Sequence, residues 1–196
     1  MDRDDIADLL ARADSGDQSA WNQLVDQYNG LLWSVARGFR LDTADAADVV
    51  QNTWLRLVEN LDRITEPDKL GSWLGTTVRR ECLQLLRRAG RETPGAEPEM
   101  LVAVPDPAPP VDERLLLDEL DAALWRALST LSGPCRRLLR VLMASPAPRY
   151  ADVAAALDMA VGTIGPARQR CLERLRRAAL AEELLAGPGT DRAGAP

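Results

Sequence analysis

Apolar side chains recur every three or four residues along most of the first 90 positions, a spacing that predicts amphipathic α-helices. One apolar stripe runs through residues 21–39, a second through residues 49–61 and a third through residues 71–88. A short acidic helix is expected near residues 6–10. No convincing alternating pattern of the kind that predicts a β-strand appears. Together these helices predict an N-terminal helical domain over residues 1–92.

The helical pattern stops after this region and returns further along the chain. Residues 93–112 contain repeated prolines and several carboxylates but no basic residue, so we expect a flexible acidic linker. Residues 113–185 regain the helical pattern, with a short helix at 150–157, a tight turn and a longer helix from Val161, which is the order of a helix-turn-helix. Residues 186–196 are expected to be disordered. The predicted fold class is all-α: two small helical domains joined by a Pro-rich acidic linker, with a helix-turn-helix in the second.

The charge of the chain is unevenly distributed. The 196 residues carry a formal net charge of −6, which at first argues against a nucleic-acid partner, because basic side chains supply most of the affinity for phosphate. Arginines nevertheless gather at residues 79–91 and 168–177, and each stretch contains a single glutamate. Carboxylates concentrate elsewhere, at the N-terminus, at residues 42–48 and in the linker. Two basic helices therefore remain candidates for binding DNA.

The reactive residue types exclude most enzyme classes. The chain has no histidine, which rules out His-based acid–base catalysis and His-containing zinc sites. No phosphate-binding glycine loop or cluster of metal ligands is present either, so we expect no enzymatic activity, cofactor, metal or small-molecule substrate. Cys82, Cys135 and Cys171 are far apart in the sequence and lie in apolar helical patterns. We interpret them as small buried thiols in a reducing compartment.

The sequence also bears on where the protein acts. No apolar run approaches the roughly 18 residues needed to cross a membrane, and the acidic start lacks the basic region and apolar core of a signal peptide. We therefore expect a cytoplasmic protein without membrane insertion.

Three segments together resemble one family. The acidic helix at 45–56, the arginine-rich segment 73–88 and the helix-turn-helix at 150–177 are similar to those of bacterial RNA polymerase sigma factors of the extracytoplasmic-function (ECF) group. The resemblance covers most of residues 21–180 and lapses in the middle. It implies a factor that binds core RNA polymerase, directs it to promoter DNA and promotes initiation of transcription. It also implies an anti-sigma factor as a further candidate partner.

The resemblance is sharpest in the segment 45–56. In the family this helix docks on a basic coiled coil of the largest polymerase subunit. The resemblance assigns core-polymerase binding here to Asp45, Asp48, Gln51, Asn52 and Arg56. Acidic and amide groups opposite an apolar stripe would provide charge complementarity for such a partner. Alternatively the aspartates only stabilise the start of the helix, where Thr43 is a candidate N-cap, although Gln51 lies too far along for capping.

The third helix resembles the family segment that melts and captures the minus-ten promoter element. The candidates for contacts with this element are Arg79, Arg80, Gln84, Arg87 and Arg88. Opening DNA requires a basic groove for a single strand and a pocket for an unstacked base, and the spacing of these arginines returns them to one side of a helix. Family members commonly have asparagine where Arg80 stands. We interpret Trp73 as a packing residue.

The second helix of the helix-turn-helix resembles the one that reads the minus-thirty-five element. The candidates for this contact are Arg149, Thr163, Pro166, Ala167, Arg168, Gln169, Arg170 and Arg174. Side chains near the start of such a helix reach base edges, and flanking arginines hold phosphates. The chain departs from the family at Gly165 and Pro166; if the helix starts near Gly162, the missing amide of Pro166 belongs to the first turn and costs little. Alternatively this segment is a helical hairpin whose arginines are simply solvated.

Two other functions compete with promoter reading. An autonomous helix-turn-helix regulator with an N-terminal interaction domain would need strong operator affinity of its own, whereas an acidic chain suits action within a larger assembly. A pure interaction protein, such as a decoy that occupies polymerase, would not need the two arginine-rich helices. The acidic linker suits either an RNA-mimicking strand in a basic channel or a plain flexible tether.

Overall fold

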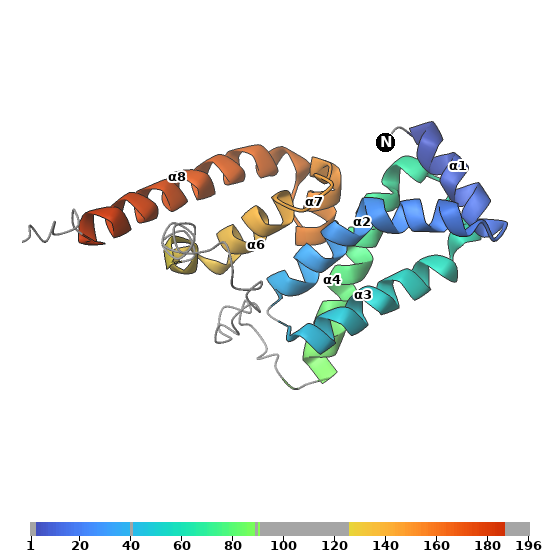
Figure 1. Ribbon diagram of the computed structural model, residues 1–196, viewed down its shortest axis with the longest axis horizontal. Coiled ribbons are helices and arrows are strands. Elements are labelled where there is room, and N and C mark those ends of the chain that lie inside the picture. Colours follow the sequence, from blue (N-terminus) through green and yellow to red (C-terminus); the bar gives the residue numbers. More distant parts are fainter. Residues whose placement is uncertain (1–2, 40, 89, 91–125, 187–196) are drawn as a thin grey trace, which may run out of the picture.

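The regular elements of the described chain are all helical (Figure 1). The computed structural model describes residues 3–39, 41–88, 90 and 126–186. The elements, in chain order, are α1 (Arg3–Asp14), α2 (Gln18–Gly38), α3 (Thr43–Val58), the short 3-10 helices η1 (Leu61–Arg63) and η2 (Pro67–Lys69), α4 (Leu70–Arg88), α6 (Gly133–Leu142), α7 (Tyr150–Leu157) and α8 (Val161–Ala186). The predicted all-α class is confirmed.

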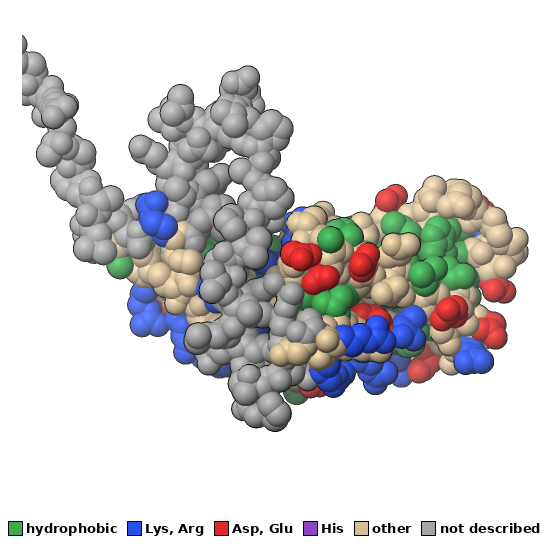
Figure 2. Space-filling model, turned by 90° about the horizontal axis from the view of Figure 1, so that it is seen from below, with side chains coloured by type: hydrophobic (Ala, Val, Ile, Leu, Met, Phe, Trp, Pro, Cys, Tyr) green, Lys and Arg blue, Asp and Glu red, His purple; other side chains and the backbone are tan. Residues whose placement is uncertain are grey.

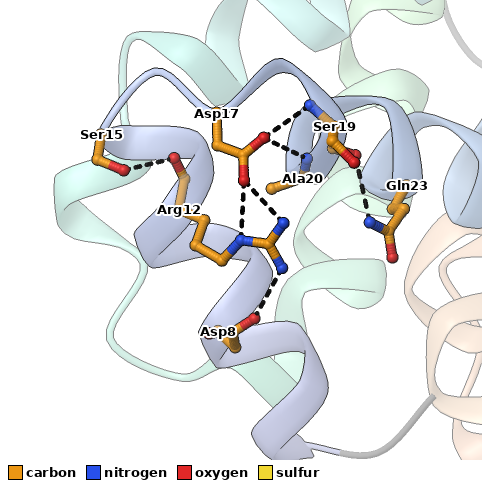
Figure 3. Close-up of polar contacts among 7 residues, drawn as sticks. All are labelled: Asp8, Arg12, Ser15, Asp17, Ser19, Ala20 and Gln23. Atoms are coloured by element: carbon orange, nitrogen blue, oxygen red, sulfur yellow. Dashed lines mark hydrogen bonds and ion pairs between the residues drawn. The ribbon is translucent and has the colours of Figure 1, made fainter.

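Asp17 organises the turn between α1 and α2 (Figure 3). Its Oδ1 accepts hydrogen bonds from the backbone amides of Ser19 at 2.8 Å and Ala20 at 3.3 Å, so Asp17 is the N-cap of α2. Its Oδ2 accepts from Nε and Nη2 of Arg12 at 2.9 and 2.7 Å. The hydrogen bonds from Arg12 lower the pKa of the Asp17 carboxyl. One side chain thus begins a helix and ties it to the preceding one.

The N-cap of α3 is Asp42, whose Oδ1 accepts a hydrogen bond from the amide of Asp45 at 2.8 Å. The prediction of Thr43 as the cap was wrong by one position. Asp42 keeps the extended backbone that a cap requires, with φ −65° and ψ 173°, whereas Thr43 is already the first helical residue. Because both residue types are good caps, the sequence alone did not separate them.

The core of the N-terminal half lies where α2, α3 and α4 meet. Leu24, Leu57 and Leu74 are fully buried there. The rings of Trp21 and Trp54 pack edge to face with centroids 5.7 Å apart, an arrangement that suits the quadrupole of aromatic rings. The predicted stripes of α2 to α4 therefore face one another, as the helical spacing indicated.

The C-terminal half consists of α6, α7 and α8, which pack on one another around Leu138, Val153 and Ile164. Between α7 and α8, Asp158 adopts a left-handed conformation with φ 58°. Aspartate tolerates this region better than most residues because its short side chain can bond locally. The short helix, turn and longer helix predicted for this segment are present with these boundaries.

A disulfide joins Cys135 of α6 to Cys171 of α8. The interpretation of all three cysteines as separate buried thiols was therefore wrong for this pair. The two residues stand 36 positions apart, and only the packing of α6 against α8 brings their Cα atoms to 5.4 Å. Cys82 remains a buried free thiol, and burial raises its pKa to about 12.

The two halves share one continuous core, because α4 packs directly against α7 and α2 packs against α6. In Figure 1, α7 lies beside α4 and α8 leads away from the N-terminal helices. The predicted linker at 93–112 and nearly all of the predicted tail at 186–196 lie outside the described residues.

The disulfide generates a prediction for stability. A crosslink that closes a loop of this length is expected to stabilise the fold by about 3–4 kcal/mol through loss of unfolded-state entropy. Urea unfolding of the oxidised protein should therefore show a higher midpoint than unfolding in the presence of a thiol reductant. The Cys171→Ala variant should show the lower midpoint in both conditions. Equal midpoints for the oxidised and reduced wild-type protein would contradict this expectation.

Candidate protein and nucleic-acid interfaces

The solvent-facing side of α3 combines polar and apolar residues. Asp48, Gln51 and Asn52 are exposed, and Asp45 is half-buried near the N-terminus of the helix. One turn further along, Leu55 and Val58 are also exposed, at 51% and 52%. The sequence prediction placed Val58 in the buried stripe of residues 49–61, which was wrong, and gave Leu55 no role. Seen from below in Figure 2, acidic and hydrophobic side chains lie close together on this part of the molecule. We call Asp48, Gln51, Asn52, Leu55 and Val58 the α3 face.

Arg56, a predicted member of the polymerase-binding set, is directed to a neighbouring helix. Its Nε lies 2.5 Å from Oε1 of Glu81 in α4. The Glu81 side chain is 12% exposed and that of Arg56 is 48% exposed. In the free chain this ion pair links α3 to α4 and sets Arg56 apart from the α3 face.

The arginines of α4 divide into two groups. Arg79 is half-buried, and its Nη2 lies 2.9 Å from Oδ2 of Asp158 in the turn before α8. Arg80, Arg87 and Arg88 are exposed, and Gln84 between them is half-buried. The helix therefore presents basic side chains along its length, while Arg79 is engaged with the C-terminal half.

An open surface cavity of about 400 Å³ lies where the 3-10 helices lead into α4. Its lining combines apolar, hydroxyl and charged groups, among them Ile64, Glu66, Trp73, Thr76 and Arg80. Part of the ring of Trp73 thus faces the cavity while the rest packs against the core. The sequence prediction missed the cavity, because residues 61–69 show no periodic pattern that would have located its wall.

The arginine-rich part of α8 is mostly open to solvent. Thr163, Pro166, Arg168, Gln169 and Arg170 are exposed and Ala167 is half-buried. Arg174 is also exposed, and its Nη1 lies 3.8 Å from Sγ of Cys135. Several arginine side chains gather at the end of the molecule formed by α6 and α8 (Figure 2). All seven candidates for the minus-thirty-five contact in this segment therefore lie on one helix, α8.

Pro166 lies inside α8 as the sixth residue of the helix. The expectation that its missing amide belongs to the first turn was wrong, because only the first four amides of a helix lack a helical partner and Pro166 is the sixth residue of α8. At this position a proline deprives the carbonyl of Gly162 of its helical partner. Gly165 precedes the proline, and without a Cβ it avoids the clash that normally keeps a pre-proline residue out of the helical region.

Arg149, the remaining predicted DNA contact, is held at the boundary between the two halves. Its Nε lies 3.2 Å from Oδ2 of Asp152, and its Nη2 donates to the backbone carbonyl of Asp68. Asp152 is 2% exposed and also accepts a hydrogen bond from Oγ of Ser72 in α4 at 2.8 Å. The hydrogen bond to Asp152 raises the pKa of Arg149. Sequence reasoning missed Asp152 because its partner Ser72 is 80 positions away.

The environment of Tyr28 in α2 belongs to the same region. Burial, reinforced by the negative charge of Asp152, raises the pKa of Tyr28 to about 12. A small cavity of about 110 Å³ separates this tyrosine from the loop that leads into α7, with Pro146, Pro148 and Arg149 among its lining residues. Tyr28 stays neutral here, so Asp152 and Arg149 supply the charge at this boundary.

Within the described ranges, no helix is long and apolar enough to cross a membrane. The same residues contain no group of His, Cys, Asp or Glu side chains that could hold a metal ion.

Comparison with known proteins identifies the class to which these surfaces belong. The family profile of Sigma-70 region 2 matches residues 24–92, which include α3, the cavity and α4. An ECF RNA polymerase sigma factor, SigM of Mycobacterium tuberculosis, is 30% identical over 171 residues, covering 87% of this chain and 83% of SigM. SigE of Mycolicibacterium smegmatis is 28% identical over 165 residues; the match covers 83% of this chain but only 63% of that relative.

Two solved structures are similar over most of the chain. CnrH, solved in complex with the cytosolic domain of CnrY, is 27% identical with a TM-score of 0.55, and the match covers 92% of this chain and 99% of CnrH. The sigma factor RpoE of Bartonella quintana, solved with the anti-sigma factor NepR, is 25% identical with a TM-score of 0.52, covering 81% and 95%. The fold and the region 2 match define a sigma factor of the sigma-70 type. Within that class, the chain belongs to the ECF RNA polymerase sigma factors, as the resemblance predicted.

Proposed function

We propose that the chain binds core RNA polymerase through the α3 face and directs it to promoters through α4 and α8, so that transcription starts at specific sites. The observation that carries this proposal is the presentation of three chemically distinct surfaces by one member of the ECF family. These are a polar and apolar face on α3, a basic helix beside an open cavity, and an arginine-rich helix that follows a tight turn. Such a factor acts in the cytoplasm, where polymerase is found.

The α3 face suits a basic protein partner with an apolar centre. Asp48 supplies negative charge, and Gln51 and Asn52 supply hydrogen-bonding amides, which steer and orient the encounter. Leu55 and Val58 supply apolar area that would be removed from water on docking. The family resemblance indicates the basic coiled coil of the largest polymerase subunit as this partner. Arg56 forms an ion pair with Glu81, so its role here is to position α3 against α4.

The cavity at the start of α4 supports a role in capturing an unstacked base of the minus-ten element. A flipped base needs a pocket with an apolar or aromatic wall and polar groups for its edge. Trp73 and Ile64 provide the wall, and Thr76 and Glu66 provide polar groups. The exposed Arg80, Arg87 and Arg88 would follow the phosphates of the strand.

The exposed side chains of α8 support a role in reading the minus-thirty-five element. Gln169 can pair bidentately with adenine, and Arg168 and Arg170 can pair with guanine or hold phosphates. Thr163 lies in the first turn, where a recognition helix commonly meets base edges. The autonomous regulator is not favoured, because the family match places the chain among polymerase-associated factors.

We propose an inhibitory protein as a further partner. The support is that RpoE of Bartonella quintana was solved in complex with the anti-sigma factor NepR. Exposed Leu55 and Val58 give such a protein an apolar surface to cover, in competition with polymerase.

Reconstituted transcription tests the proposal as a whole. Purified chain is mixed with sigma-free bacterial core polymerase and a promoter library, and transcripts are mapped. We expect start-site-specific transcripts only when the chain is present. Specific transcripts without the chain, or none with it, would remove the sigma-factor assignment of function.

Asp48→Arg should weaken binding to core polymerase about 10-fold or more, because it places like charge against a basic partner. Surface plasmon resonance on immobilised core enzyme measures this change. Asp14→Arg, at the exposed end of α1, is the matched control and should bind as the wild type does. Equal binding by the Asp48→Arg variant would count against the α3 face.

Replacing Arg168 and Arg170 together by alanine should weaken promoter binding by the holoenzyme. Each arginine is expected to contribute about 1–3 kcal/mol if it contacts a base, or to reduce the salt slope by about 1 if it contacts a phosphate. Electrophoretic mobility shifts at several salt concentrations distinguish the two roles. Arg126→Ala, an exposed arginine of the same half, serves as the control. A double variant that loses only thermal stability would show a structural role for these arginines.

A further inference from the structure

The open cavity at the start of α4 contains a charge that binding to phosphates does not require. Arg63, Lys69 and Arg80 line this cavity of about 400 Å³, and so does Glu66. The three cations suit the phosphates of a strand, but a carboxylate beside them repels the same phosphates. Glu66 therefore needs another explanation, either in the fold or in what the cavity binds.

The fold itself depends little on the side chain of Glu66. The residue stands at the N-cap position of η2, yet its side chain makes no capping hydrogen bond. Its Oε1 lies 2.6 Å from Nζ of Lys69, and the side chains of Glu66 and Lys69 are 58% and 63% exposed. An ion pair between side chains this exposed contributes little to stability. Both head groups can therefore turn towards a ligand at small cost.

Glu66 and Lys69 together present a hydrogen-bond acceptor beside a donor. The two residues stand three positions apart, and the amide of Lys69 donates to the carbonyl of Glu66 at 2.8 Å. Residues three apart in a 3-10 turn project their side chains to the same side of the backbone. The cavity thus has a carboxylate and an ammonium group next to one another at its edge.

The hydroxyl groups on the α4 wall of the cavity add further acceptors. Oγ1 of Thr76 donates to the carbonyl of Ser72 at 2.9 Å, and Oγ1 of Thr77 donates to the carbonyl of Trp73 at 2.8 Å. Oγ of Ser72 donates to Oδ1 of Asp152 at 2.8 Å. Because a hydroxyl has one hydrogen to donate, these three groups offer a ligand their lone pairs.

Such a wall discriminates between bases by their exocyclic groups. Adenine, cytosine and guanine each carry an amino group beside an unprotonated ring nitrogen, whereas thymine carries carbonyl oxygens instead. The two hydrogens of an amino group can bind the Glu66 carboxylate and a lining hydroxyl, and Lys69 can donate to the ring nitrogen. A thymine carbonyl in the same place would face the oxygens of Glu66 and Thr76 and leave them without a donor.

We propose that Glu66 is a specificity-determining residue, which makes the cavity select an unstacked base with an exocyclic amino group over thymine. Lys69 positions the Glu66 carboxylate and supplies the neighbouring donor. This inference rests on the proposed function for the presence of DNA at the cavity. It assigns the chemical class of the base, and the experiments identify which of the three amino-bearing bases is bound.

The first test uses the full chain with core polymerase and a library of promoters with randomised sequence. At one position, wild-type holoenzyme should disfavour thymine roughly 10-fold against an amino-bearing base, a usual cost for one mismatched position. Glu66→Gln introduces an amide that can donate to a carbonyl, so the preference should fall to about 2-fold at that position alone. Asp62→Asn removes an exposed carboxylate from the neighbouring η1. It is the matched control and should keep every wild-type preference.

The second test removes only the amino group of the bound base. A promoter recovered from the library is prepared with an unpaired bubble over that position, so that DNA melting does not enter the comparison. The preferred base is replaced by its counterpart without the amino group: 2-pyrimidinone for cytosine, purine for adenine or hypoxanthine for guanine. In fluorescence anisotropy, wild-type holoenzyme should bind roughly 10-fold more weakly after the replacement, and Glu66→Gln holoenzyme about 2-fold more weakly.

Three results would overturn the inference. The first is identical base preferences for wild type and Glu66→Gln at every position, and the second is a wild-type preference for thymine at the position that Glu66→Gln alters. The third is equal binding by wild-type holoenzyme of the preferred base and its amino-free counterpart, a comparison that stands even if the variant does not assemble with polymerase. Far-UV circular dichroism checks that each variant retains its helices. Failure of the proposed function would appear separately, as absence of specific transcripts from wild-type chain with core polymerase.

Discussion

The arrangement of the described chain depends on how closely α4 and α7 approach one another. Gly71 and Gly75 bring the two helices into near backbone contact, and Asp152 is buried at the same place with Ser72 and Arg149 as partners. Without Gly71, the carboxylate would have no room, and without Gly75 the backbone of α7 could not approach so closely. Without the carboxylate, Ser72 and Arg149 would lose their shared acceptor. This pairing of small residues with one buried charge holds α7 against α4, where Arg79 and Arg149 are engaged by carboxylates.

Acidic and basic side chains lie on different helices, so a chain that is acidic overall can still bind a nucleic acid. The net charge of −6 disfavours unspecific association with DNA, while local groups of arginine on α4 and α8 remain able to bind it. The acidic and amide side chains of α3 lie on a different element, where they suit a basic protein. Such a factor suits action within a larger assembly that positions it on DNA. Its charged side chains orient it on its partners more than they raise its affinity for DNA.

Helical periodicity predicted the main helices and their buried sides, and the composition of the arginine-rich segments predicted which helices are basic. The failures arose where long-range packing decides the result. The pairing of Cys135 with Cys171 depends on α6 meeting α8, and the engagement of Arg149 depends on Asp152 being buried against α4. Two local errors remain. Asp42 and Thr43 are both good caps, so the sequence did not separate them. Pro166 would lie beyond the four unpaired amides of the first turn even if α8 began at Gly162.

The exposed leucine and valine of α3 also affect how long the unbound protein survives. Apolar groups left in water on an isolated subunit invite self-association and recognition by chaperones and proteases. Residues 55 and 58 sit side by side on such a surface, so any protein that covers them protects the chain as well as using it. The cellular concentration of this factor would then depend on the concentration of the protein that binds residues 55 and 58. Copies without that partner would be degraded before bound copies.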